Sequence, residues 1–204
     1  MDLTFGSLTS LKAAILPESL RARTEWDSVL AAMARGVAAS FEEHCRREFI
    51  RLENATFAFT ADCSQVSLPR FPVETIISVE RRDSLSDGWQ DLGLASIYNL
   101  SEASGLVEFG SVLGGHLSRC RITYTGGYWV DVSENGSGTL PAGATPLPFD
   151  LVSAWHLQCH HEVDRRDLIR NAAAKKESDA ALPSVSKLEL VPRVAEILQP
   201  FRRL

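Results

Sequence analysis

Candidate ligands for a metal ion lie in the stretch WHLQCHHEV. It contains His156, Cys159, His160 and His161, whose nitrogen and sulfur atoms are the ligand types that hold zinc. His156 and His160 are four residues apart, so a helix would place them on one face. The zinc-protease motif HExxH has an acid directly after its first histidine, whereas here Glu162 follows the pair. The pattern therefore favours partly buried histidines beside a core cysteine, and we predict no metal, cofactor or catalytic residue.

The other cysteines give little support to a thiol catalyst. Cys45, Cys63 and Cys120 are widely spaced and form no CxxC pair. His44 directly precedes Cys45, and neighbouring side chains on a helix point about 100° apart, so these two cannot act as nucleophile and base. A reactive thiol also needs a nearby positive charge that lowers its pKa. A small metal- or thiol-dependent enzyme is therefore the weakest of the functional alternatives.

The stretch RITYTGGYWV, residues 121–130, is the most unusual in the chain. Alternating strand-forming residues lead into Gly126-Gly127 and then into two aromatic residues. The stretch matches neither GxGxxG nor GxxxxGK[ST], the glycine patterns that cradle phosphate. Because glycine tolerates positive φ, we expect a sharp turn that places Tyr128 and Trp129 against the sheet edge or a neighbouring molecule.

Composition and charge narrow the class of protein. The chain has 204 residues, of which 45% are hydrophobic and 23% charged, as expected for one globular domain with or without an inserted subdomain. Its formal net charge is −5, whereas a protein that grips phosphates is usually basic. Tight nucleic-acid binding is therefore disfavoured, although an acidic chain can line a passage through which DNA slides.

The sequence also indicates a compartment. Its start, MDLTFGSLTSLKAAIL, lacks the basic-then-apolar pattern of a secretion signal. No apolar run approaches the roughly 20 residues that a membrane-spanning helix needs. We therefore expect reduced cysteines, assembly in a reducing cytosol and no membrane partner.

Hydrophobic spacing predicts two long helices. Apolar residues recur every three or four positions over residues 25–50, and a second helix is expected over residues 148–171, with Pro148 in its first turn. Between them, short β-branched and aromatic runs separated by turn residues predict an antiparallel sheet or small barrel. The apolar face of the first long helix comprises Trp26, Leu30, Met33, Val37, Phe41, Cys45 and Phe49.

The predicted fold class is α+β. It is a long-helix bundle with an inserted small antiparallel β subdomain and a C-terminal arm that ends in a helix. We expect a domain of residues 1–171 and an arm of residues 172–204. The domain comprises helices at 8–16, 25–50 and 148–171, a β insertion at 55–128 and a loop at 129–147.

The order of these segments resembles the head–tail connector, or adaptor, proteins of long-tailed bacteriophages and prophages. The likeness rests on four stretches that together run from about Leu8 to Asp167. They are LTSLKAAIL with the following helix that ends in CRREF, LPRFPVETIISVERRD, GLVEF followed by RITYTGGY, and LPFDLVSAWHLQCHHEVDRRD. YTGGY is the sharpest of these motifs. The loop 129–147 and the segment 172–191 are longer than the family pattern leads us to expect.

This resemblance implies a structural protein and not an enzyme. Such proteins form a ring, usually twelve-fold, beneath the portal of a DNA-filled capsid, where they extend the DNA channel. The implied partners are further copies of the chain in a dodecameric ring, the portal protein, the next neck or tail-completion protein, and phage DNA that passes without sequence-specific binding. The implied location is the virion neck, after assembly in the bacterial cytoplasm.

Contacts with the portal or an adjacent subunit are expected at the terminal helix and at the glycine turn. The candidates are Leu198, Phe201, Arg202, Arg203, Tyr128 and Trp129. The loop 131–147 is expected to face the channel or the next ring. A chain truncated after residue 186 is expected to fold but not to join heads. The second structural alternative is a tail-completion protein, which would attach to tails instead of portal-bearing heads.

Overall fold

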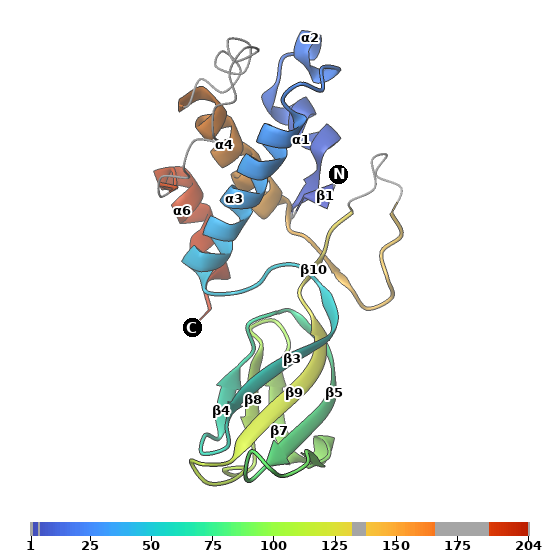
Figure 1. Cartoon of the computed structure of the whole chain (residues 1–204), viewed down its shortest axis with the longest axis vertical. Helices are drawn as coiled ribbons and strands as arrows, with labels where there is room; N and C mark the ends of the chain where they lie inside the picture. The colour runs from blue at the N-terminus through green and yellow to red at the C-terminus, as the bar shows by residue number, and fades with distance from the viewer. Residues whose placement is uncertain (1, 4, 132–137, 166–187, 204) are drawn as a thin grey trace. The chain divides into compact units, whose positions relative to one another are not determined.

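The computed structural model describes residues 2–3, 5–131, 138–165 and 188–203, and the chain divides into two compact units (Figure 1). The helical unit comprises residues 1–45, 130–140 and 147–202. The β unit comprises residues 46–129, 141–146 and 203–204. Helices and antiparallel sheets are both present, so the fold is α+β.

The helical unit is organised around two helices that pack on each other. Its helices are α1 (Leu8–Ile15), α2 (Glu18–Arg21), α3 (Asp27–Cys45), α4 (Phe149–Arg165) and α6 (Pro192–Leu198), followed by a 3₁₀ turn, η2 (Gln199–Phe201). The short strands β1 (Asp2–Leu3) and β2 (Gly6–Ser7) pair antiparallel. Helices α3 and α4 contact each other, and each also contacts α1 and α6, so these two are the central helices. No described helix is both long and apolar enough to cross a membrane.

Small residues on α3 let a large side chain of α4 come close. Ala31 and Ala34 are fully buried on α3. The indole Nε1 of Trp155, on α4, donates a hydrogen bond to the carbonyl oxygen of Ala34 at 3.1 Å. The Phe5 and Trp155 rings meet edge to face, with centroids 6.2 Å apart. This packing satisfies the indole N–H inside an apolar core.

The first long helix is shorter than the sequence predicts. Helix α3 ends at Cys45 instead of residue 50, because Arg46 has a φ of 52°, which a right-handed helix cannot accommodate. Phe49, which was expected on the apolar face of the helix, is a buried residue of the β unit. In the second long helix, α4 begins at Phe149, and the predicted end at 166–171 lies outside the described residues.

The β unit contains two antiparallel sheets, with strand orders β3-β9-β5-β6 and β4-β8-β7. The strands are β3 (Leu52–Thr60), β4 (Gln65–Ser67), β5 (Val73–Arg82), β6 (Gln90–Asp91), β7 (Ile97–Ser101), β8 (Leu106–Phe109) and β9 (Arg119–Gly126), with a 3₁₀ turn, η1 (Leu94–Ser96). Strands β10 (Tyr128–Trp129) and β11 (Thr145–Pro146) form a separate parallel pair. The strands therefore begin at Leu52, three residues before the predicted insertion, and part of the predicted loop 129–147 is the strand β11.

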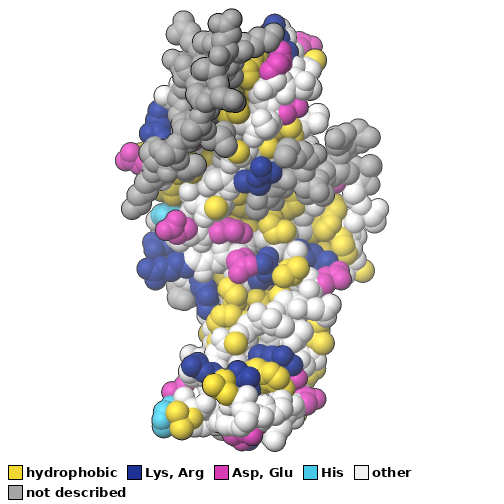
Figure 2. Space-filling view, viewed as in Figure 1, with side chains coloured by type: hydrophobic (Ala, Val, Ile, Leu, Met, Phe, Trp, Pro, Cys, Tyr) yellow, Lys and Arg dark blue, Asp and Glu magenta, His cyan; other side chains and the backbone are white. Residues whose placement is uncertain are grey.

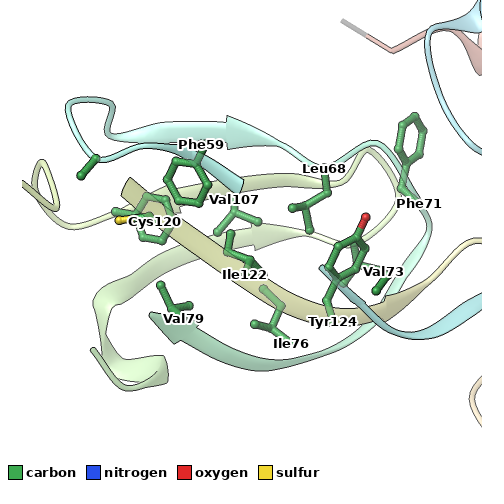
Figure 3. Packing of buried hydrophobic residues seen from close by; sticks show 13 residues of the cluster. Phe59, Leu68, Phe71, Val73, Ile76, Val79, Val107, Cys120, Ile122 and Tyr124 are labelled. Carbon is green, nitrogen blue, oxygen red and sulfur yellow. The ribbon is translucent and has the colours of Figure 1, made fainter. Parts of the chain in front are cut away.

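Both sheets contribute to one apolar core. Along β9, Cys120, Ile122 and Tyr124 are buried, and the residues between them face the other way. Figure 3 shows these side chains gathered with Val107 of β8 and Leu68. The period-two pattern thus gives each sheet an inner face in the core and an outer face.

Candidate assembly surfaces

Gly126 and Gly127 allow strand β9 to pass close to two other backbone segments of the β unit. A Cβ atom at Gly126 would lie 2.9 Å from the carbonyl oxygens of Arg70 and Pro72, and one at Gly127 would lie 2.7 Å from the backbone of Ile50. Gly127 also has a φ of 98°, which disfavours any other residue. Its N–H donates to the Pro72 carbonyl at 2.8 Å. At the double glycine the chain therefore crosses two other backbone segments of the β unit, so closely that no Cβ atom fits. This place is called the backbone crossing.

Arg47 lies among three aromatic rings, one of which belongs to Tyr128. Its guanidinium carbon is 3.4 Å from the ring centroid of Phe71, 4.8 Å from that of Phe49 and 5.2 Å from that of Tyr128. It also donates a hydrogen bond to the Phe71 carbonyl. Tyr128 is buried, and its N–H donates to the Phe49 carbonyl at 2.7 Å. Of the two aromatic candidates, Trp129 is the one that stays half-exposed.

The apolar side of α6 packs within its own subunit. Val194 and Leu198 have no exposed surface, and α6 contacts α3 and α4. The Cys45 thiol lies 3.7 Å from the Leu198 carbonyl oxygen, to which it donates a weak hydrogen bond. Leu198 therefore stabilises the helical unit. A truncation after residue 186 would remove two core side chains, which argues against the expectation that the truncated chain folds normally.

The last three candidate residues lie in different surroundings. Phe201 is half-buried at the end of η2, and Arg202 is exposed. Arg203 belongs to the β unit, where its Nε donates to the Ser67 hydroxyl at 3.0 Å and its guanidinium lies 5.6 Å from the Phe57 ring. Burial lowers the pKa of Arg203. Within this group, Arg202 is the exposed side chain, and Phe201 is half-exposed.

Gln158 is a structural residue that the sequence analysis missed. It is fully buried on α4. Its Nε2 donates to the Glu189 carbonyl at 3.0 Å, and its Oε1 accepts the N–H of Val191 at 2.9 Å. The side-chain amide thereby pairs with the backbone that leads into α6, and it replaces hydrogen bonds that water would otherwise supply. The only signal in the sequence is a polar residue between Trp155 and Cys159 on an apolar helix face.

The four residues of the histidine cluster occupy separate environments. Cys159 is fully buried in the helical core, whereas His160 is exposed and has its Nδ1 3.1 Å from Asp164. His161 is exposed, and His156 is half-buried with a pKa that burial lowers. Among the residues that the structure describes, no group of three or more His, Cys, Asp or Glu side chains is arranged to hold a metal. The described geometry therefore gives the metal-enzyme alternative no support.

Three of the four thiols also lack the electrostatics of a nucleophile. All four cysteines are free. Burial raises the pKa of Cys120 to about 11, and it raises the pKa of Cys159 as well. Burial and the charge of Asp62 raise the pKa of Cys63, whose thiol donates to the Thr60 carbonyl at 3.1 Å. A raised pKa keeps a thiol protonated and unreactive at neutral pH.

Comparison with known proteins gives matches in structure but not in sequence. No family model matches the chain, and no curated protein matches it. A chain from the virion of a native gene transfer agent (GTA) particle matches with a TM-score of 0.60 and 17% identity, over 97% of this chain and 89% of that chain. A chain from the neck of the empty GTA particle, computed with C6 symmetry, gives a TM-score of 0.56 and 16% identity, over 97% and 88%.

A chain from the neck of the native GTA particle, computed with C12 symmetry, is also similar. It gives a TM-score of 0.51 and 18% identity, and covers 100% of this chain and 94% of that chain. The protein shares its fold with these particle chains. Because the identities are low, the likeness establishes a common fold, and the function requires a separate argument.

Proposed function

We propose that this protein is a structural component of the neck of a phage-like particle. The observation that carries the proposal is its likeness in fold, over at least 97% of the chain, to chains from the virion and neck of GTA particles. The order of its sequence segments independently resembles the connector proteins of long-tailed phages. Two separate lines of support thus lead to the same class of protein.

In this proposal, copies of the chain form a dodecameric ring beneath the portal protein. Two of the similar structures are necks computed with C6 and C12 symmetry. A ring closes when one surface of a subunit binds a different surface of the next subunit. The ring extends the DNA channel and joins the DNA-filled head to the tail through the next neck or tail-completion protein. The formal net charge of −5 suits a subunit that surrounds DNA without holding it.

Each part of the chain has a role in this proposal. The packed helices α3 and α4 form the body of the ring. Phe201 and Arg202 contact the portal or an adjacent subunit, because a half-exposed apolar side chain lies beside an exposed basic one directly after helix α6. Three further candidates act within the subunit, where they fix the backbone of these contact regions. They are Leu198, Arg203 and Tyr128. Trp129 offers a second partly exposed contact. The loop 131–147, of which residues 132–137 lie outside the described part of the chain, is assigned to the channel or the next ring.

Deleting the gene in a strain that produces the particles tests the proposal. Electron microscopy is expected to show separate tails beside heads that have lost their DNA, and supplying the intact gene is expected to restore joined particles. Intact, infectious particles in the deletion strain would overturn the proposal. Purified protein that attaches to isolated tails, and not to portal-bearing heads, would instead identify a tail-completion protein.

A point variant tests the portal contact without removing core residues. Arg202→Glu reverses an exposed charge next to Phe201 and is expected to reduce head joining while leaving the subunit folded. Arg193→Glu is the matched control, because Arg193 is also exposed but lies on α6, with Glu196 at 3.1 Å. Equal head joining by the Arg202 variant and the control would show that Arg202 does not contact the portal.

A further inference from the structure

Three arginines lie at one end of the outer side of the four-stranded sheet. Arg119 and Arg121 alternate along β9 with buried core residues, so they point away from the core. On the adjacent strand β5, Glu80 pairs in register with Arg121, and Arg82 pairs in register with Arg119. The basic face is defined as Glu80, Arg82, Trp89, Arg119 and Arg121.

One arginine of the basic face has an acidic partner within the subunit. The Glu80 carboxylate accepts two hydrogen bonds from Arg121, at 2.6 and 3.0 Å, and these lower the pKa of Glu80. The guanidinium carbons of Arg82 and Arg121 lie 4.7 and 4.5 Å from the ring centroid of Trp89. The indole thus holds both guanidinium groups near the outer side of the sheet.

The other two arginines have no acidic partner among the described residues. Arg82 and Arg119 occupy directly opposed positions on adjacent strands, where like charges destabilise a sheet. Within the isolated subunit this arrangement costs stability. An external anion placed between the two guanidinium groups would relieve the repulsion.

The opposite side of the β unit carries a carboxylate without a cation. Val107 and Phe109 of β8 face the shared core, so Glu108 between them faces outward. Its carboxylate accepts hydrogen bonds from Gln65 Nε2 and Asn99 Nδ2, each at 3.2 Å. No described lysine or arginine pairs with it. The carboxylate face is defined as Gln65, Tyr98, Asn99 and Glu108.

A depression beside Glu108 gives the carboxylate face a shape that can receive a side chain. Its volume is about 300 Å³, and Tyr98 at its edge is 79% exposed. The depression is lined by Ser64, Gln65, Tyr98, Glu108, Phe109 and Gly110.

We propose that the basic face of one copy of this chain docks on the carboxylate face of the next copy. The inference rests on the proposed ring and names the surfaces that close it. The two faces lie on the outer sides of different sheets of one β unit, so their contact is heterologous and repeats around an axis. Glu108 of one copy supplies a carboxylate to Arg82 and Arg119 of the next copy, and these arginines supply the cation that Glu108 lacks. Tyr98 stacks on a guanidinium group or on Trp89 of the neighbour.

A second copy of the chain satisfies these charges better than DNA does. A phosphate backbone would neutralise Arg82 and Arg119 but would leave Glu108 without a cation. The net charge of −5 also opposes tight phosphate binding. On the side of the β unit visible in Figure 2, arginine side chains border hydrophobic ones, and arginine is enriched in protein interfaces.

A charge exchange between the two faces tests this inference. Variants are supplied to a producer strain that lacks the gene, and the amount of the protein in purified particles is measured by quantitative immunoblotting. Arg82→Glu combined with Arg119→Glu is expected to lower incorporation by about tenfold or more, because attraction becomes repulsion at every contact of the ring. Glu108→Lys is expected to act in the same direction. All three substitutions together are expected to restore incorporation to within about twofold of the wild type, because the charges are exchanged.

Two controls separate the loss of the contact from a loss of folding. Arg35→Glu with Arg46→Glu makes the same change in charge at exposed positions outside both faces, and normal incorporation is expected. Arg82→Glu alone removes the guanidinium from Trp89 but places an acid opposite Arg119, so the isolated subunit is expected to melt at about the same temperature as the wild type. Its incorporation is nevertheless expected to fall.

The outcomes distinguish this inference from the proposed function. Normal incorporation of the double arginine variant would overturn the inference while the neck proposal stands. A triple variant that stays as low as the double variant would also overturn it and would indicate that the arginines contact DNA or another protein. Absence of the wild-type protein from particles would overturn the proposed function, and the inference with it.

Discussion

The helical unit and the β unit are stabilised in different ways. In the helical unit, Trp155 of α4 bonds to Ala34 of α3, and α6, with the buried Leu198, packs on both helices. The core of this unit therefore depends on the last residues described. The β unit is built mainly from the continuous stretch 46–129, and its strands pair with one another. Charged groups also contribute there, as in Arg51, which binds Glu74 at 2.7 and 3.0 Å. A change near the C-terminus should therefore destabilise the helical unit first.

The largest expected effect tests that dependence directly. Leu198→Ala removes a fully buried side chain and should lower the free energy of unfolding by about 2–5 kcal/mol. Hydrogen exchange should become faster in α3 and α4 and stay unchanged in β3, β5 and β9. Ile122→Ala is the matched change in the β unit and should show the reverse distribution. Equal acceleration in both units by either variant would mean that they unfold together.

A second variant strains the backbone crossing of the β unit. Gly127→Ala places a Cβ atom 2.7 Å from the Ile50 backbone at a φ of 98°. Residues held in such conformations cost about 1–3 kcal/mol before any steric clash is relieved. Chemical denaturation should show this loss, whereas Gly110→Ala, at a position with no atom within 4 Å, should stay within about 0.5 kcal/mol of the wild type. If the two variants were equally stable, the backbone around Gly127 would have room for a Cβ atom.

A third variant removes the side-chain hydrogen bonds that hold the backbone leading into α6. Gln158→Ala leaves the Glu189 carbonyl and the Val191 N–H without their partner. The expected loss is about 1–3 kcal/mol, the usual cost of an unsatisfied buried polar group. Amide exchange at Val191 should accelerate, while Leu157→Ala, at a largely exposed position on the same helix, should leave it unchanged. An unchanged rate in the Gln158 variant would show that the side-chain amide does not hold this segment.

The smallest expected effect is a pH dependence in the helical unit. Burial lowers the pKa of His156 from 6.5, so folding favours its neutral form. The stabilising contribution is complete above pH 6.5 and is lost as the pH falls toward the lower folded pKa, because the unfolded chain takes up the proton first. Urea unfolding between about pH 5 and about pH 8 should show this decline, and His156→Gln should flatten it. The same slope in the variant would exclude His156 as the source.

The sequence predicted α3, α4 and the strands because their residues are buried on one face, which leaves a periodic pattern. It did not predict the end of α3, because nothing in CRREF marks Arg46 as the residue with a positive φ. The sequence also predicted a helix at the end of the arm, with the apolar residues Leu198 and Phe201 as contact candidates. It cannot show whether the apolar side is covered by the same subunit or by a partner, and Leu198 is covered by its own subunit.

A single sequence does not show which residues make up the basic face and the carboxylate face. The opposition of Arg82 and Arg119 follows from strand register, which pairs residues far apart in the chain. The same holds for Glu108, whose amide partners Gln65 and Asn99 come from two flanking strands. In the sequence these residues are only scattered polar positions in strands.

The most direct test of the central claim is cryo-electron microscopy of the neck in purified particles that contain this protein. The proposal predicts a ring of density between the portal and the tail, into which the helical unit and the β unit each fit once per subunit. Density that fits this chain only at another place in the particle, or its absence from purified particles, would contradict the proposal.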